Sequence, residues 1–339
     1  MAKIRWYVLS NFFKTFLTIF IPLFFVISLV YVIKIASLTT KIEISFSELI
    51  EVFGYFIPMI LFYTLPISFI ASVSSMFFRL SQDNELIALF SLGIKASYIV
   101  RIIAYISIFI SSLLLFLSLL VMPHSKYKFL YFKEKKFSEA RLNIVPNQLG
   151  QKFGDFFIYV KSKNENQLRD VVIYNKNKNN FDQLFLSKNG EIKDDNGLFS
   201  LVLYNGTGYT YSHETLKEIQ YDSMHIYDNI DMKEMSFQNS LIYWSEAKHN
   251  NGVKRRLLFS IFSSFIPILS LYIIASFSII NARYQTNHSF LVTASISSIF
   301  YLLAVAIKQN ANEVIFISSI ILSIIASIFI FKKRISSFY

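Results

Sequence analysis

The sequence predicts an α-helical polytopic membrane protein with an all-β domain outside the membrane, inserted between its third and fourth helices. Six long stretches lack Asp, Glu, Lys and Arg, and a polar block with the pattern of short strands divides them three and three. A bilayer core about 30 Å thick needs roughly 20 apolar residues in a helix, so each stretch can span it. The stretches, of 18 to 27 residues, are Thr15–Ile33, Val52–Phe78, Ile102–Ser125, Leu257–Ala282, Tyr284–Ile307 and Val314–Phe331.

Composition agrees with a membrane protein and argues against a nucleic-acid binder. Apolar residues make up 54% of the chain and charged residues only 16%. Between Pro123 and Gly252 there are 17 basic and 16 acidic residues, whereas the rest of the chain holds 16 basic and 6 acidic residues. The positive charge therefore belongs to the membrane part. The absence of cysteine excludes disulfides and thiolate metal sites.

The order of these segments predicts the domain boundaries. Residues 1–125 should hold helices one to three with a cytoplasmic loop at 79–97, residues 126–252 a stalk and the outer β domain, and residues 253–339 helices four to six. The first stretch is too long for the apolar part of a signal peptide and lacks a small-residue cleavage site. We therefore expect it to remain as a helix.

Basic residues near the helix ends predict that both termini are cytoplasmic and that the polar block faces out. Ten basic residues then lie inside: Lys3, Arg5, Lys14, Arg79, Lys95, Arg101, Arg283, Lys332, Lys333 and Arg334. The short outer loops hold Lys34, Lys41 and Lys308, and the start of helix four holds Lys254, Arg255 and Arg256. Flanks of a long translocated domain weigh little in this rule, so the orientation stands.

The outer block has the pattern of antiparallel strands. Short β-branched and aromatic runs occur at Phe156–Lys161, Val171–Asn175, Gln183–Ser187, Leu198–Tyr204 and Tyr209–Tyr211. Turn residues separate them at Lys188–Gly190, Asp195–Gly197 and Asn205–Gly208. Short strands without intervening helices favour an all-β sandwich. His124–Leu142 differs, because its Phe and Lys residues recur at helical spacing, and we expect a helical stalk there.

No pattern typical of a catalytic site is present. The chain has no GxxxxGK[ST] loop, so it cannot hydrolyse a nucleotide by the P-loop mechanism. Its five histidines lack metal-ligand spacing, and nothing resembles a nucleophile elbow. We therefore expect a non-enzymatic chain without a metal or cofactor.

The loop between helices two and three contains a short amphipathic segment. Leu86, Leu89, Phe90 and Ile94 form an apolar stripe, Asp83 and Glu85 suit the positive end of a helix, and Gly93 can cap it. Taken alone, this pattern fits a helix resting on lipid as well as one that docks to a partner.

At this point the chain resembles the LptF/LptG family of lipopolysaccharide-export permeases over nearly its whole length. The similarity includes the six-helix layout with the outer domain after helix three, Arg5-Trp6-Tyr7 before helix one, and the loop Asp83-Asn84-Glu85-Leu86 followed by Gly93-Ile94. The basic start of helix four and Ile280-Asn281-Ala282-Arg283 after it are also similar. This last match favours LptF, whereas Ile33-Lys34 is closer to LptG, so the subtype leans towards LptF.

The resemblance implies a permease subunit of an ABC transporter in the bacterial inner membrane. Such permeases pair as an LptF–LptG heterodimer on two copies of the ATPase LptB. They extract lipopolysaccharide and pass it through an outer β-jellyroll to LptC and the LptA bridge. The implied coupling residues are Asp83, Glu85, Leu86, Leu89, Phe90 and Gly93, and no nucleic acid is involved.

Two further sites are predicted for the lipid. Five cations at one depth, namely Lys34, Lys41, Lys254, Arg255 and Arg256, could bind lipid A phosphates by charge-assisted hydrogen bonds. For Lys34 alone, snorkelling of a helix-end lysine is the competing explanation. Apolar residues of the β domain, among them Phe157, Tyr159, Leu201 and Leu203, could line a groove for acyl chains or form an ordinary core.

Two other functional classes remain open from the residues alone. The first is a membrane receptor or assembly scaffold whose β domain binds a protein. The second, which the lack of clustered acids or metal ligands disfavours, is a membrane enzyme with an outward domain. An ATPase and a second six-helix protein among the co-purifying partners would distinguish the transporter from both.

Overall fold

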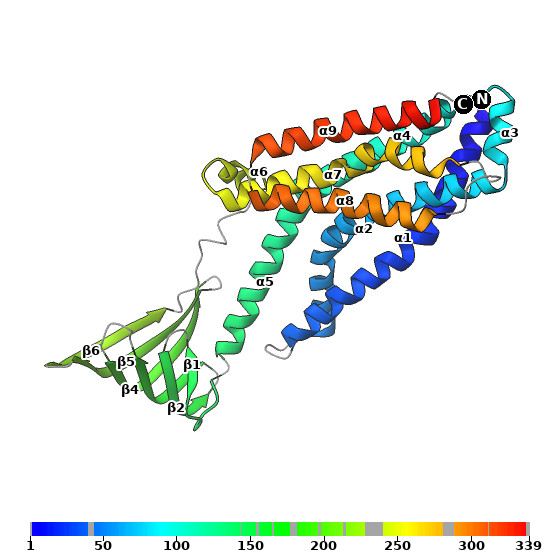
Figure 1. Ribbon diagram of the computed structural model, residues 1–339. Helices are drawn as coiled ribbons and strands as arrows, with labels where there is room; N and C mark the ends of the chain where they lie inside the picture. The colour runs from blue at the N-terminus through cyan, green and yellow to red at the C-terminus, as the bar shows by residue number, and fades with distance from the viewer. Residues whose placement is uncertain are drawn as a thin grey trace. The chain divides into compact units, whose positions relative to one another are not determined.

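The computed structural model of the chain contains two compact units (Figure 1). It describes residues 2–39, 44–142, 144–153, 156–164, 166–176, 182–195, 198–212, 215–227, 240–280, 288–310 and 312–336. The membrane unit comprises Met1–Ala36, Leu49–Lys128 and Phe237–Tyr339, and the outer unit comprises Ser37–Glu48 and Phe129–Ser236. The division into domains at residues 126 and 252 stays a prediction.

The six predicted membrane helices are confirmed in number and order among the described residues. They are α1 (Ala2–Thr39), α2 (Phe46–Gln82), α4 (Ala96–Phe116), α7 (Asn251–Ser278), α8 (Ser289–Asn310) and α9 (Glu313–Phe331). Two short helices, α3 (Glu85–Ser91) and α6 (Ser240–Ser245), accompany them. A π-helical turn, Leu117–Val121, joins α4 to α5 (Met122–Leu142), which confirms the predicted helical stalk.

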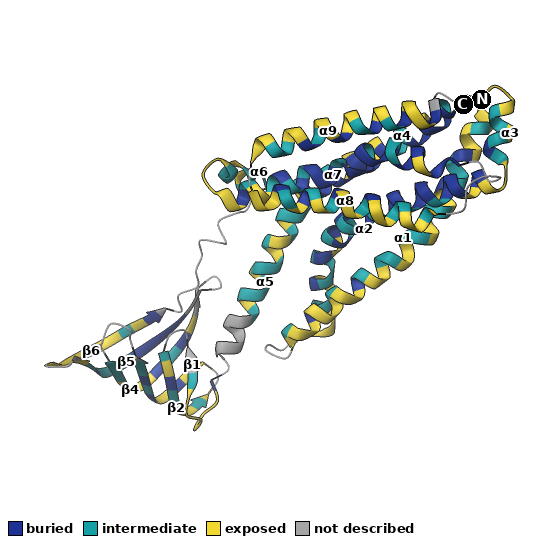
Figure 2. Cartoon of the chain, in the orientation of Figure 1, coloured by how far each residue is buried: buried dark blue, intermediate teal, exposed yellow. Residues whose placement is uncertain are grey.

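Helix α7 is largely buried and packs against α4, α8 and α9 (Figure 2). Serine side chains join it to neighbouring elements. The Ser278 hydroxyl donates to the Ser74 Oγ of α2 over 3.2 Å, and the Ser327 hydroxyl of α9 donates to the Leu269 carbonyl over 2.8 Å. Ser264 of α7 lies 3.3 Å from Ser118 in the π-helical turn. Small side chains at these points let helix backbones approach closely, and their hydroxyls bond between helices.

The outer unit contains one antiparallel sheet in which every strand pairs with its neighbours in the chain, in the order β1 to β6. The strands are β1 (Gln151–Phe153), β2 (Phe156–Asn164), β3 (Gln167–Lys176), β4 (Asp182–Asp195), β5 (Leu198–Ser212) and β6 (Thr215–Tyr227). The all-β prediction is confirmed, but the described strands form a meander without the crossovers of a two-sheet sandwich. Short connections between consecutive strands favour this hairpin pairing.

A crease crosses strands β2 to β6, where two consecutive residues of each strand point away from the apolar cluster. These pairs, all exposed except for the half-buried Tyr204, are Lys161–Ser162, Arg169–Asp170, Lys188–Asn189, Tyr204–Asn205 and Asp222–Ser223. They lie side by side in the strand register. Side chains of a strand normally alternate between the two faces of the sheet. Two consecutive outward residues interrupt this alternation, so beyond the crease each strand buries the alternate set of positions. Apolar side chains from both sides of the crease therefore meet in one buried cluster.

Two predicted turns lie inside strands because their residues build the crease. Lys188–Gly190 belongs to β4 and Asn205–Gly208 to β5, so these turn predictions were wrong. Asn205 has the left-handed φ of 50° that asparagine tolerates. The Ser187 hydroxyl donates to the carbonyls of Asn189 and Tyr204, over 2.6 Å in each case. The third predicted turn falls between β4 and β5, and its residues 196 and 197 lie outside the described residues.

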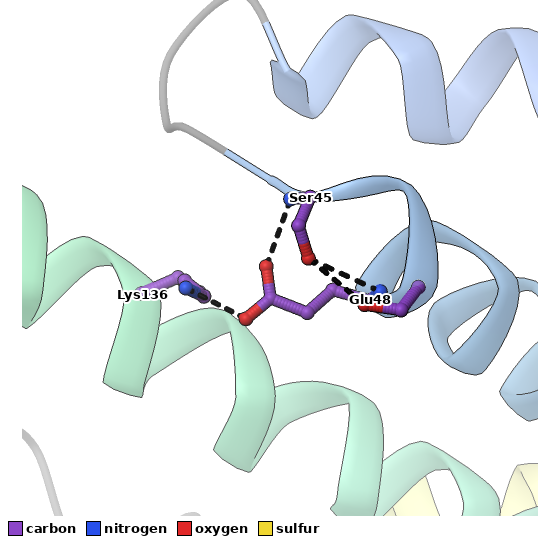
Figure 3. A network of polar contacts seen from close by, with 4 residues as sticks. Ser45, Glu48 and Lys136 are labelled. Carbon is purple, nitrogen blue, oxygen red and sulfur yellow. Dashed lines mark hydrogen bonds and ion pairs between the residues drawn. The ribbon is translucent and has the colours of Figure 1, made fainter.

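In the outer unit, the stalk is joined to the first turn of α2 by a polar network (Figure 3). The Ser45 backbone N–H donates to Glu48 Oε2 over 2.9 Å, and the Glu48 N–H donates to Ser45 Oγ over 3.4 Å, which together form a capping box. The Lys136 ammonium of α5 lies 2.8 Å from Glu48 Oε1. One carboxylate thus caps α2 and pairs with the stalk.

We predict that Gly206→Ala destabilises the outer sheet. A Cβ at this position would overlap the Leu186 carbonyl oxygen and the Tyr221 hydroxyl, and the backbone oxygen cannot move without breaking the ladder. The expected loss is about 1–3 kcal/mol, as for other overpacked sites. Gly208→Ala is the matched control, because its Cβ would meet the Phe185 side chain at 2.9 Å and a backbone atom, the Ile219 carbonyl oxygen, only at 3.8 Å. Limited proteolysis of the purified chain during a thermal ramp measures both, and equal protection of the two variants would contradict the prediction.

We also predict that the two roles of Glu48 can be separated. Glu48→Gln keeps a side chain that can complete the capping box but removes the ion pair, and Lys136→Met removes the ammonium while leaving the Glu48 cap in place. Both should raise hydrogen–deuterium exchange in residues 44–50 slightly, because partly exposed pairs contribute about 1 kcal/mol or less. Glu48→Ala also loses the cap and should raise exchange further, by about another 1 kcal/mol of local stability. Equal exchange in Glu48→Gln and Glu48→Ala would show that the capping contact contributes nothing.

Candidate functional site

A helix, α3, is present where the sequence predicts a coupling helix, and backbone geometry explains both of its ends. Asn84 adopts the left-handed φ of 58° immediately before the helix, which turns the chain sharply after α2. At the other end Gly93 has a φ of 77°, its N–H donates to the Phe90 carbonyl, and the Ile94 N–H donates to the Leu89 carbonyl. This pair of bonds is a Schellman motif, so Gly93 does cap the helix as predicted.

The apolar stripe of α3 faces the chain's own core. Leu86 is buried, and Leu89, Phe90 and Ile94 pack partly buried against the core of the membrane unit. What remains exposed includes Asp83, Ala88 and Leu92, and the Leu92 side chain is 77% exposed. Leu92 was not among the predicted site residues because it lies just off the apolar stripe. The feature of the sequence that could have indicated an exposed apolar residue is a leucine outside the apolar stripe, next to the capping Gly93.

A cleft of about 500 Å³ lies between the start of α1 and α3. It is lined by Lys3, Ile4, Tyr7, Glu85, Ala88, Leu89 and Leu92. The wall is mostly apolar, with a lysine and a carboxylate as its charged groups. A cleft of this composition suits a partner side chain that is apolar with a polar end.

Polar contacts tie the start of α1 to three other helices. The Tyr7 hydroxyl donates to the Glu85 carboxylate of α3. Arg5 Nε donates to the Tyr98 hydroxyl of α4 over 3.1 Å, and Arg79 Nη2 of α2 donates to Asn11 Oδ1 over 2.7 Å. A displacement of α3 would therefore act on α1 directly, through Glu85 and Tyr7.

The predicted outer cations divide into two groups. The Lys254 ammonium lies 2.6 Å from the Glu313 carboxylate at the start of α9, and Arg256 Nη1 donates to the Tyr243 hydroxyl of α6 over 2.7 Å. Arg255 is exposed. Lys308, which we did not include among the lipid-binding candidates, lies 5.3 Å from the Phe259 ring of α7 and belongs to this group.

Lys34 lies apart from the α7 cations. Its ammonium is 5.6 Å from the Phe56 ring of α2 and 5.9 Å from the Tyr31 ring of α1, a cation–π arrangement. The remaining candidate, Lys41, lies outside the described residues. The structure therefore brings Lys254, Arg255 and Arg256 together on one helix and places Lys34 on another pair of helices.

The four predicted groove residues lie on two faces of the sheet. Leu201 and Leu203 are fully buried in the apolar cluster. Phe157 and Tyr159 alternate with the buried Ile158 and Val160, so they face the other side. Beyond the crease, the cluster is closed by Tyr221, whose hydroxyl donates to the Leu186 carbonyl over 3.2 Å. Burial raises the pKa of Tyr221, so this phenol stays protonated and can donate at neutral pH.

Comparison with known protein families gives a match across most of the chain. The family model for the lipopolysaccharide export system permeases LptF and LptG matches residues 6–333. No curated protein matches the chain. The matched segment includes α3 and its capping glycine, the cations of α7, and the outer sheet. Within the described ranges, no three His, Asp or Glu side chains come together as a metal ion would require.

Proposed function

The chain belongs to the LptF/LptG family of lipopolysaccharide export permeases, a family of multi-pass inner-membrane proteins, and on that premise we propose that it is the membrane subunit of an ATP-driven extractor. In this proposal it removes lipopolysaccharide from the inner membrane and passes it towards the outer membrane. The family match over residues 6–333 carries the proposal. The subtype leans towards LptF, on the residues that follow helix four.

The energetics of extraction support an external source of energy. Moving one acyl chain of about 12 carbons from lipid to water costs on the order of 10 kcal/mol, at about 0.8 kcal/mol per CH₂. A lipid with several such chains cannot leave the bilayer unaided, and the sequence has no P-loop. The proposed partners are therefore two copies of the ATPase LptB and a paralogous permease, with LptC and LptA receiving the lipid.

The proposed topology places both termini and α3 in the cytoplasm, where the ATPase would bind. The exposed residues in and beside α3, among them Asp83, Ala88 and Leu92, supply the docking surface together with the cleft beside Glu85. Leu86, Leu89 and Phe90 pack in or against the membrane core, so in this proposal they hold α3 in place and leave its exposed side to the ATPase. A docked ATPase would then move a helix that is packed firmly against the membrane unit.

The proposed lipid path begins at the outer cations and continues along the apolar face of the outer sheet. Among the cations, Arg255 and Lys34 are exposed, whereas Lys254 is engaged with Glu313. Leu201 and Leu203 belong to the apolar face that would shelter acyl chains. Phe157 and Tyr159 lie on the opposite face, so we leave them out of this path.

Replacement of Glu85 by Lys should abolish co-purification of the ATPase or uncouple ATP hydrolysis from transport. The matched control is Tyr7→Phe, which keeps the carboxylate and removes only its phenol donor. If Glu85 binds the partner, Tyr7→Phe should retain the ATPase while Glu85→Lys and Leu92→Ser lose it. If Glu85 only holds α1, Tyr7→Phe should reproduce Glu85→Lys. Quantitative mass spectrometry of the complex purified from its own cells measures how much ATPase co-purifies with each variant.

Exchange of Lys34 and Arg255 for Glu should lower lipid-stimulated ATPase activity and raise sensitivity to large hydrophobic antibiotics. The reason is lost pairing with lipid A phosphates, and each charge-assisted bond contributes roughly 1.5–3 kcal/mol. A double change of Lys188 and Lys217 to Glu alters net charge equally, on exposed strand positions. That control should transport normally at equal expression. Normal transport by the Lys34/Arg255 variant would mean that these charges only anchor the helices.

A further inference from the structure

The third membrane helix is interrupted just before the chain leaves for the outer unit. The Met122 N–H donates to the Leu117 carbonyl, which is the i→i−5 pairing of a π-helical turn. Pro123 follows at once and has no N–H. In α-helical pairing residue 123 would donate to the carbonyl of Leu119, so the proline removes that donor. Single π-turns of this kind are frequent at functional positions.

Helix α6, on the segment that returns from the outer unit, supplies donors to this interruption. The Trp244 indole N–H donates to the Leu119 carbonyl over 2.7 Å, and the Ser240 hydroxyl donates to the Leu120 carbonyl over 2.8 Å. The Trp244 ring also meets the Tyr243 ring edge-on at 4.7 Å, and the Tyr243 hydroxyl accepts from Arg256 of α7. One short helix is thereby bonded both to the outgoing helix and to α7.

Tryptophan is common at membrane surfaces, where its ring sits at the level of the lipid headgroups. That general role does not explain the contact, because a headgroup-level indole needs only water or lipid as a partner. Here the indole N–H donates to the Leu119 carbonyl, which residue 123 would serve in α-helical pairing if it were not proline. A side-chain donor from a distant segment, Trp244, thus takes the place of the backbone donor that Pro123 lacks, which indicates a specific contact between the two segments.

We propose that Pro123, Trp244 and Ser240 form a clasp that holds the outgoing and returning segments together at the membrane unit and so restrains the motion of the outer domain. Trp244 is then a positioning residue for the transfer of lipid to the outer sheet, and this consequence rests on the proposed function. The clasp itself does not depend on which molecule is transported. If the two side-chain hydrogen bonds of the clasp break, α6 separates from the outgoing helix while the backbone hydrogen bonds of the membrane helices remain.

The test uses the full chain purified with its partners and exploits the absence of native cysteine. Spin labels on Gln309→Cys and Lys217→Cys, both exposed, report the distance between the units by pulsed electron paramagnetic resonance. The variants are Trp244→Phe, Pro123→Ala and the two combined. In parallel, a photoreactive amino acid at Met224, which packs at the edge of the apolar cluster, captures lipopolysaccharide when ATP is added.

Trp244→Phe should broaden the distance distribution, with about a fivefold rise in the broad component for one lost hydrogen bond. It should also reduce lipid capture, while ATPase binding remains. Adding Pro123→Ala should restore both, because alanine returns the missing backbone N–H. An unchanged distribution in Trp244→Phe, or no rescue by Pro123→Ala, would overturn the clasp. If Trp244 only anchored the chain at the level of the lipid headgroups, Pro123→Ala would not rescue Trp244→Phe. Absence of lipid capture even in the wild type, with the distance pattern as expected, would overturn the proposed function alone.

Discussion

Inside a bilayer every backbone N–H and C=O must find its partner within the protein, and the arrangement of this chain follows from how that requirement is met. Helices satisfy most of it, and serine hydroxyls add further bonds within and between the helices. Ser264 and Ser276 of α7 donate to carbonyls one turn back, whereas Ser278 donates across to α2. The same small residues permit close approach of the backbones, so bonding and packing coincide at Ser264 and Ser278 of α7. Where proline breaks the pattern at residue 123, side chains from α6 supply donors.

The outer sheet meets a related difficulty in another way. A single meander of long strands cannot enclose an apolar core unless it bends, and bending disturbs the ladder between strands. Here the disturbance is gathered into one row, where Asp170 and Asn205 adopt left-handed backbone angles and the Ser187 hydroxyl bonds two carbonyls. The Lys161 ammonium lies 3.3 Å from the Asp170 carboxylate within the same row. Apolar side chains from both halves then share one cluster.

Much of the architecture could be predicted because its signals are local. The membrane helices follow from uninterrupted apolar length, and the cap of α3 follows from Gly93. The crease could not be predicted, since Asn205–Gly208 has the composition of a turn whether the chain reverses or only bends. The surface against which α3 packs could not be predicted either. Its apolar stripe indicated burial but could not distinguish burial against this chain from burial against a partner, and the structure places Leu86 inside. Contacts such as Tyr7 with Glu85 or Trp244 with Leu119 join distant segments and leave no periodicity in the sequence.

The crease has a consequence for how this domain can change over evolutionary time. The strand register runs through the row without a slip, so each strand switches faces at the same level. Losing or gaining a single residue within one strand would turn its side chains on one side of the row outward, while its neighbours stayed unchanged. Length variation among descendants of this chain should therefore accumulate in the connections between strands. The number of residues between each connection and the crease should vary far less than the identity of those residues.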